Sequence, residues 1–121
     1  MRDDKFKISN CVKELIYRID ENLINFPKKE IELKIAIRNY SYELLLVVQE
    51  ANITNSMQKR LELIEKAISL VKQIDFLINI CEKKMIINSK KYYKFGESLD
   101  RIIRYLVAWM NATKESINKR A

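Results

Sequence analysis

The sequence predicts an all-α protein, an up-down-up-down antiparallel four-helix bundle. Its 121 residues include one Gly and one Pro, which leaves almost no turn residues for β-hairpins. Four stretches carry apolar residues at the 3-4 spacing of an amphipathic helix, and only short segments separate them. A chain of this length can bury the core of one domain, so we expect residues 1–121 to form a single unit.

Helix signals in the sequence set the expected boundaries. Pro27 separates the first two helices, because proline ends one helix but suits the first turn of the next. A run of small polar side chains ends the second helix, and Asn55 with Gln58 resembles a capping box for the third. Asn88 or Ser89 is expected to cap the fourth. The predicted helices are about residues 8–26, 28–51, 56–84 and 89–113.

The second helix has two apolar faces where a small monomer needs only one. One stripe contains Ile31, Ile35, Tyr42, Leu45 and Leu46, with Arg38 and Gln49 among them. The opposite side contains Leu33, Ala36, Ile37, Tyr40, Leu44, Val47, Val48 and Ala51. If one face packs into the chain's own core, the other needs a partner. We therefore predict a homo-oligomer whose interface includes Ile31, Ile35, Tyr42 and Leu45; the pattern does not decide which face is the interface, and a central helix of a compact monomer is the alternative.

The fourth helix carries a glycine and two pairs of opposite charge. Gly96 costs about 1 kcal/mol relative to alanine inside a helix, and we interpret it as a point where a neighbouring helix approaches closely. Glu97 with Arg101 and Asp100 with Arg104 stand four residues apart, the spacing of surface ion pairs worth a few tenths of a kcal/mol. Surface pairing alone explains both arginines without a ligand.

The charge of the chain favours an anionic partner, either nucleic acid or a membrane surface, because 23 Lys and Arg against 16 Asp and Glu leave a net charge of +7. In the predicted topology the first and third connections lie at the same end of the bundle. We call this end the lysine-rich end, and it is defined by Lys28, Lys29, Lys34, Lys83, Lys84, Lys90, Lys91 and Lys94. Three glutamates reduce its charge to about +5, while the opposite end is nearly balanced. Such an end suits phosphate-backbone binding, although ordinary solvated loops give the same pattern.

Two further residue types extend this hypothesis. Tyr93 stands among the lysines and could stack on unpaired bases, whereas Tyr92 belongs to the core stripe. Arg38 lies in an apolar stripe, so its guanidinium must either reach water or find an acceptor. In the functional interpretation Arg38 lines an intersubunit surface and faces an anionic ligand.

The residues used in catalysis are scarce. The sequence has no His, the usual general base near neutral pH, and its single glycine excludes a Gly-rich phosphate loop. Cys11 and Cys81 are isolated, and we interpret them as core side chains in a reducing compartment. We expect a cytoplasmic protein with no catalytic residue, cofactor, metal site or membrane partner, since no stretch has the composition of a signal peptide or a membrane span.

Two blocks of sequence resemble a known family. Phe26-Pro27-Lys28-Lys29, followed by a long amphipathic helix, is similar to the corner of small four-helix proteins encoded in intervening sequences of bacterial 23S ribosomal RNA genes, and of accessory variability determinant (Avd) proteins of diversity-generating retroelements. The block from Ser98 to Trp109 is similar to the fourth helix of Avd proteins at Asp100, Ile102, Arg104, Leu106 and Trp109. Ile103, Val107 and Ala108 stand where that family often has glycine. Val48-Gln49-Glu50-Ala51-Asn52 departs from the Asn-Ile-x-Glu-Gly signature of the ribosomal branch, which favours the Avd branch.

The resemblance implies a barrel-shaped homopentamer that binds the retroelement's reverse transcriptase and its template RNA or cDNA, with weak sequence preference, during mutagenic copying. It carries over Arg104, Trp109 and the corner at Phe26, Pro27 and Lys28. We assign Arg104 to nucleic-acid binding and Trp109 to the oligomer interface. The other residues assigned to nucleic-acid binding, Arg38 and Arg101 with the lysine-rich end, rest on charge geometry alone. A ribosomal intervening-sequence protein of unknown role, or a structural oligomer without nucleic-acid function, is the alternative.

Overall fold

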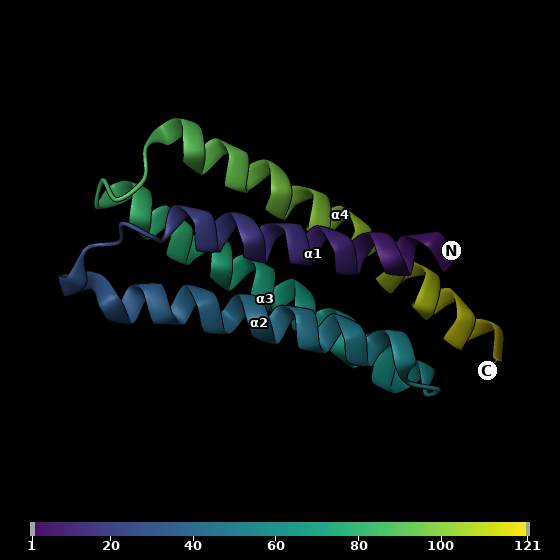
Figure 1. The fold of residues 1–121 in the computed structure, drawn as a ribbon. Coiled ribbons are helices and arrows are strands. Elements are labelled where there is room, and N and C mark those ends of the chain that lie inside the picture. Colours follow the sequence, from purple (N-terminus) through teal and green to yellow (C-terminus); the bar gives the residue numbers. More distant parts are fainter. Residues whose placement is uncertain (1, 121) are drawn as a thin grey trace.

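The computed structural model describes the backbone of residues 2–120 and the side chains of residues 7–119. This part of the chain forms α1 (Arg2–Asn22), a short 3-10 turn η1 (Lys28–Glu30), α2 (Ile31–Ile53), α3 (Met57–Lys83) and α4 (Ser89–Arg120). Each helix packs antiparallel against the next one along the chain, and α4 returns to pack against α1 (Figure 1). The predicted all-α class and the four-helix bundle are confirmed for these residues. None of the four helices has the length and apolar content that a membrane span requires.

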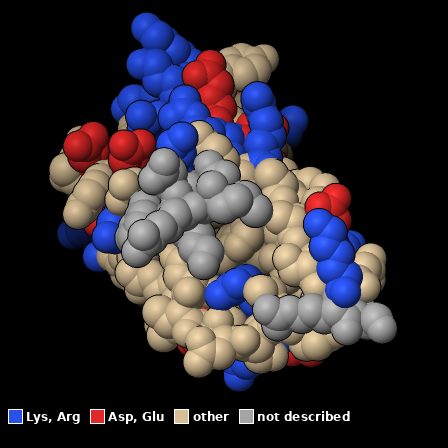
Figure 2. Space-filling view, turned by 90° about the vertical axis from the view of Figure 1, so that its right-hand side faces the viewer, with Lys and Arg blue, Asp and Glu red and all other residues tan. Residues whose placement is uncertain are grey.

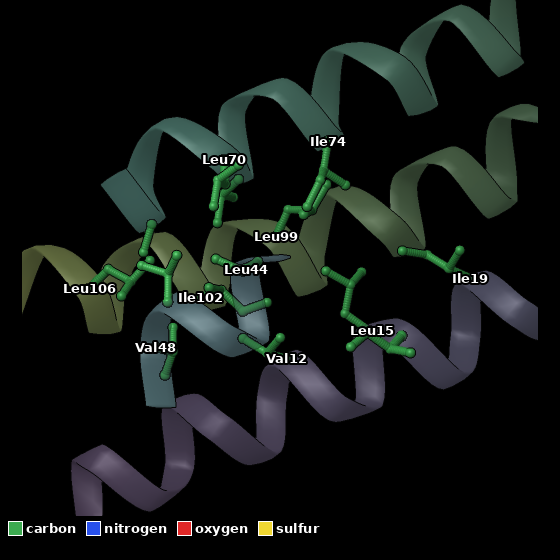
Figure 3. Close-up of a cluster of buried hydrophobic side chains, with 14 of the residues drawn as sticks. Val12, Leu15, Ile19, Leu44, Val48, Leu70, Ile74, Leu99, Ile102 and Leu106 are labelled. Atoms are coloured by element: carbon green, nitrogen blue, oxygen red, sulfur yellow. The ribbon is translucent and has the colours of Figure 1, made fainter. Parts of the chain in front are cut away.

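A single apolar core fills the space between the four helices. Each helix turns one stripe of branched aliphatic side chains inward, so that side chains of all four meet (Figure 3). A fully buried side chain of this size stabilises the fold by about 1.5–3 kcal/mol. The labelled side chains in that view are Val12, Leu15, Ile19, Leu44, Val48, Leu70, Ile74, Leu99, Ile102 and Leu106.

Three predicted helix boundaries, at both ends of α1 and at the end of α4, are wrong by several residues. α1 ends at Asn22 rather than at residue 26, because the Asn22 side chain donates a hydrogen bond (2.7 Å) to the Arg18 carbonyl and the residues ahead of Pro27 disfavour helix. Phe26 still packs against the core. α1 also begins earlier than predicted, and α4 continues to Arg120 rather than fraying after Thr113, since neither Gly nor Pro follows to break it.

The α2–α3 corner is capped differently from the prediction. Ser56, not Asn55, is the N-cap of α3, and its hydroxyl accepts a hydrogen bond (3.2 Å) from the backbone N–H three residues on. The guanidinium of Arg60 donates to the carbonyl oxygens of Ala51 (2.9 Å) and Thr54 (2.8 Å). One arginine of α3 therefore satisfies carbonyl groups that the end of α2 leaves without helical partners.

Gly96 does not mark a close helix approach, contrary to the prediction. A Cβ added there would meet nothing within 4 Å, and the residue borders a shallow hollow between α3 and α4 that Val71, Leu99 and Ile103 also line. Its φ is not positive, so neither packing nor backbone geometry requires glycine.

We predict that Gly96→Ala raises the free energy of unfolding by about 1 kcal/mol, because alanine removes backbone freedom from the unfolded chain and fits the open space. Urea denaturation of the two proteins measures the difference. Ala108, exposed in the same helix, is the matched control: Ala108→Gly should lower stability by a similar amount. A loss of stability in Gly96→Ala would show that the neighbouring helix lies closer than this fold places it.

Candidate nucleic-acid interface

The α1–α2 and α3–α4 connections meet at one end of the bundle, as the predicted topology requires (Figure 1, left). Lys84 Nζ at the end of α3 lies 2.7 Å from Glu30 Oε2 in η1. This contact joins two segments more than fifty residues apart in sequence. The predicted convergence of the two connections is therefore confirmed.

The α3–α4 corner is a tight reversal held by backbone hydrogen bonds. Met85 has a positive φ of 61°, and its N–H donates to the Glu82 carbonyl (2.9 Å) while the N–H of Ile86 donates to the Cys81 carbonyl (2.8 Å). This is the Schellman arrangement that ends many helices. Asn88 then caps α4, since its Oδ1 accepts from the backbone N–H three residues on (2.8 Å), which confirms one of the two caps predicted. The turn is short enough to keep the lysines before and after it together.

The lysines of the lysine-rich end point largely into solvent. All except Lys34, which is half-buried, are exposed. Among the side chains that the structure describes, Lys84 is the one lysine of this group in an ion pair. Within residues 7–119, the other lysines of this group have no carboxylate in an ion pair with them, so phosphate oxygens can approach them without first breaking such a pair.

Figure 2 looks along the bundle from the end opposite the α1–α2 and α3–α4 connections. In the part of this view that is drawn in colour, basic and acidic side chains stand beside one another towards the top. A broad uncharged area occupies the lower part. In this view the basic side chains gather towards the top, and few stand in the lower part.

Arg38 is not part of the lysine-rich end. Its Nε lies 3.5 Å from Asp20 Oδ1 of α1, and its Nε and Nη2 donate to the Tyr42 hydroxyl at 3.2 and 3.0 Å. The hydrogen bond to Tyr42 raises the pKa of Arg38 further above its ordinary value, with a smaller effect of Asp20. The guanidinium of Arg38 therefore has acceptors within its own chain, so an anionic ligand is not required to supply one.

Arg101 and Arg104 also lie apart from the lysines. At 1.5 Å per residue they stand about 18 and 22 Å along α4 from its first residue. Arg104 pairs with Asp100, with Nε 2.9 Å from Oδ2, which confirms one predicted surface pair. The predicted pair of Glu97 with Arg101 is not among the ion pairs of the described side chains. The structure therefore divides the predicted nucleic-acid-binding set into eight clustered lysines and three separate arginines.

Trp109 is a core residue, which corrects its assignment to the oligomer interface. The side chain is 9% exposed and packs with the buried residues of its own bundle. Its backbone carbonyl accepts a hydrogen bond (2.8 Å) from the buried Thr113 hydroxyl one turn later. Trp109, one of the residues that resemble the fourth helix of Avd proteins, therefore packs inside its own bundle.

The two faces of α2 have different surroundings. Ile37, Leu44, Val47, Val48 and Ala51 are buried in the core. Of the predicted interface stripe, Leu45 is half-buried. The other apolar members are between 42% and 56% exposed, namely Ile31, Ile35, Tyr42 and Leu46. The structure therefore decides which face of α2 is left uncovered by the chain itself.

Helix α1 extends this uncovered surface, which the sequence analysis missed. Because Arg38 contacts Asp20 of α1 and the two helices are antiparallel, the exposed Tyr17 of α1 comes level with Tyr42. The exposed Ile24 stands in the connection that follows α1. Tyr17 stands outside the buried stripe of α1, and that position was the available signal. We call the combined surface the α1–α2 face, defined by Tyr17, Ile24, Ile31, Ile35, Tyr42, Leu46 and Ile53.

The described residues define a class of protein: a basic four-helix bundle with one lysine-rich end and one uncovered apolar face. No group of three His, Cys, Asp or Glu side chains among them is placed to hold a metal ion. Burial raises the pKa of the Cys81 thiol to about 11, which leaves very little thiolate near neutral pH. Comparison of the chain with protein-family models, with curated proteins and with solved structures finds no match in any of the three.

Proposed function

We propose that this protein is a non-enzymatic nucleic-acid-binding adaptor that holds the phosphate backbone of RNA or cDNA at its lysine-rich end. The observation that carries the proposal is the contact between Lys84 and Glu30, because it brings the lysines of two distant connections into one cluster. Binding of this kind is electrostatic and largely indifferent to sequence. The mechanism is positioning: the lysines fix the strand while other surfaces meet protein partners.

The specific partner is proposed from the sequence resemblance. Similarity to Avd proteins supports a role as accessory protein of a retroelement reverse transcriptase during mutagenic copying. A reverse transcriptase gene with a template and a variable repeat beside this gene, together with co-purification of that polymerase, supports the proposal. A locus inside a 23S ribosomal RNA gene would instead support the intervening-sequence alternative.

We predict that replacing Lys83, Lys84, Lys90 and Lys91 together by Gln lowers affinity for both single strands and duplex. Four lost phosphate contacts should reduce the slope of log affinity against log salt by about 4 on duplex and by about 3 on single strands. Fluorescence anisotropy over a salt series measures both quantities. Circular dichroism should be unchanged because these side chains are exposed.

The matched control changes the same amount of charge at the other end of the bundle. In this variant Gln replaces four exposed lysines, namely Lys7, Lys59, Lys114 and Lys119. Its affinity and salt slope should stay much closer to those of the wild type. Equal losses in the two variants would mean that only net charge matters and that the lysine-rich end is no site.

We further propose that a second copy of the chain covers the α1–α2 face, so that the protein is a homo-oligomer, with a pentamer favoured by the resemblance. The face has several large apolar side chains, which soluble monomers rarely expose together. Copies with a net charge of +7 repel one another, but the charges of Arg38 and Asp20 beside this face compensate each other. Two copies that meet on this face keep their lysine-rich ends out of the contact.

We predict that Ile35→Glu and Leu46→Glu each lower the mass of the assembly measured by light scattering. Burial of such a side chain is worth about 1.5–3 kcal/mol, so its loss weakens each interface about 10- to 150-fold. Phe76→Glu is the control, because Phe76 is exposed on α3 outside this face. A wild-type mass near 14.5 kDa at micromolar concentration, or an equal effect of Phe76→Glu, would contradict the proposal.

A further inference from the structure

Tyr93 is an exposed aromatic side chain within the lysine-rich end. Its side chain is 70% exposed, although it lies in the second turn of α4, where its neighbours Lys90 and Lys94 are exposed lysines. Burial of a tyrosine ring would stabilise the fold, and the exposed ring of Tyr93 does not contribute this stabilisation. Nothing in the fold of the described residues uses the outer face of the Tyr93 ring.

The neighbouring Tyr92 shows the contrast. It packs against the core, and its hydroxyl accepts a hydrogen bond (3.0 Å) from the Asn79 side-chain amide of α3. The rings of Tyr92 and Tyr93 lie 6.3 Å apart, inclined at 42°. Tyr92 is therefore fixed by the bundle and flanks Tyr93 on one side, while the exposure of Tyr93 leaves ring surface available to a ligand.

The charges on the two sides of Tyr93 along α4 are opposite in sign. Lys90 lies one turn towards the corner, whereas Glu97 lies one turn in the opposite direction along α4. A polyanion in contact with Tyr93 is thus attracted towards the α3–α4 corner, where Lys83 stands, and repelled from the middle of α4. Cationic groups beside an aromatic ring are the combination that binds unpaired nucleotides, by ion pairing to phosphate and stacking on the base.

We propose that the lysine-rich end binds single-stranded nucleic acid in preference to duplex, with Tyr93 as the stacking surface for one unpaired base. The inference rests on the proposed nucleic-acid binding and adds to it the form of nucleic acid that is bound. In a duplex the bases are stacked on one another and their faces are closed to a protein ring. Only the phosphates then contribute, so the lysines bind both forms while Tyr93 distinguishes them.

The test compares three labelled ligands with the same number of phosphates: a uridine homopolymer, an abasic strand and a duplex. Stacking of one base corresponds to about 5- to 150-fold in affinity, so Tyr93→Leu should weaken binding of the homopolymer by that factor and leave the abasic strand and the duplex unchanged. Tyr93→Phe keeps the ring and should bind like the wild type. Phe76→Leu, at an exposed aromatic residue of α3 outside the α1–α2 face, controls for the general loss of a surface aromatic.

The outcomes separate this inference from the proposed function. If Tyr93→Leu binds the homopolymer as tightly as the wild type, or if it weakens all three ligands equally, stacking is overturned while lysine-based binding stands. If the wild type binds none of the three ligands, the proposed function fails and the inference fails with it. Circular dichroism of Tyr93→Leu and Tyr93→Phe verifies that both variants are folded.

Discussion

The antiparallel packing of four apolar stripes is the constraint on which every other feature depends. Leucine, isoleucine and valine side chains from all four helices meet in one core, and short connections force neighbouring helices to run in opposite directions. That arrangement alone decides which connections share an end. The lysines of residues 28–34 and 83–94 are brought together by the core rather than by any attraction between themselves, since like charges repel.

The fold tolerates this concentration of charge for identifiable reasons. The lysines stand in solvent, where salt screens their mutual repulsion over about 8–10 Å. Lys83 and Lys84 lie at the C-terminal end of α3, where the helix dipole favours cations. Glu30 compensates Lys84 directly. In the proposed function, a ligand with regularly spaced phosphates would supply the remaining compensation.

Most of the fold could be predicted from the sequence, because periodicity and scarce turn residues specify helices and their inward faces. The two faces of α2 could be recognised but not assigned, since periodicity contains no information about which face meets the core. Arg60 of α3 caps the end of α2 through a contact between two helices, so local sequence signals could not predict it. The absence of any neighbour at Gly96 and the burial of Trp109 likewise depend on distances between helices.

The candidate site was predictable in part for the same reason. Lysines near helix ends could be located once the topology was known. The arginines in mid-helix were grouped with them by charge and resemblance, and their local partners Asp20, Tyr42 and Asp100 show a structural role for two of the three. Tyr17 and Ile24 were overlooked because α1 already had a complete apolar stripe. Their relation to α2 appears only in three dimensions.

Lysine footprinting tests the central claim most directly, because it maps contact on the intact wild-type protein. Acetylation of the free protein and of its complex with single-stranded RNA, read by mass spectrometry, gives the protection of each lysine. The account predicts protection of Lys28, Lys29, Lys83, Lys84, Lys90, Lys91 and Lys94, with Lys59, Lys114 and Lys119 reacting as in the free protein. Protection centred on the latter three, or no difference between the two ends, would contradict it.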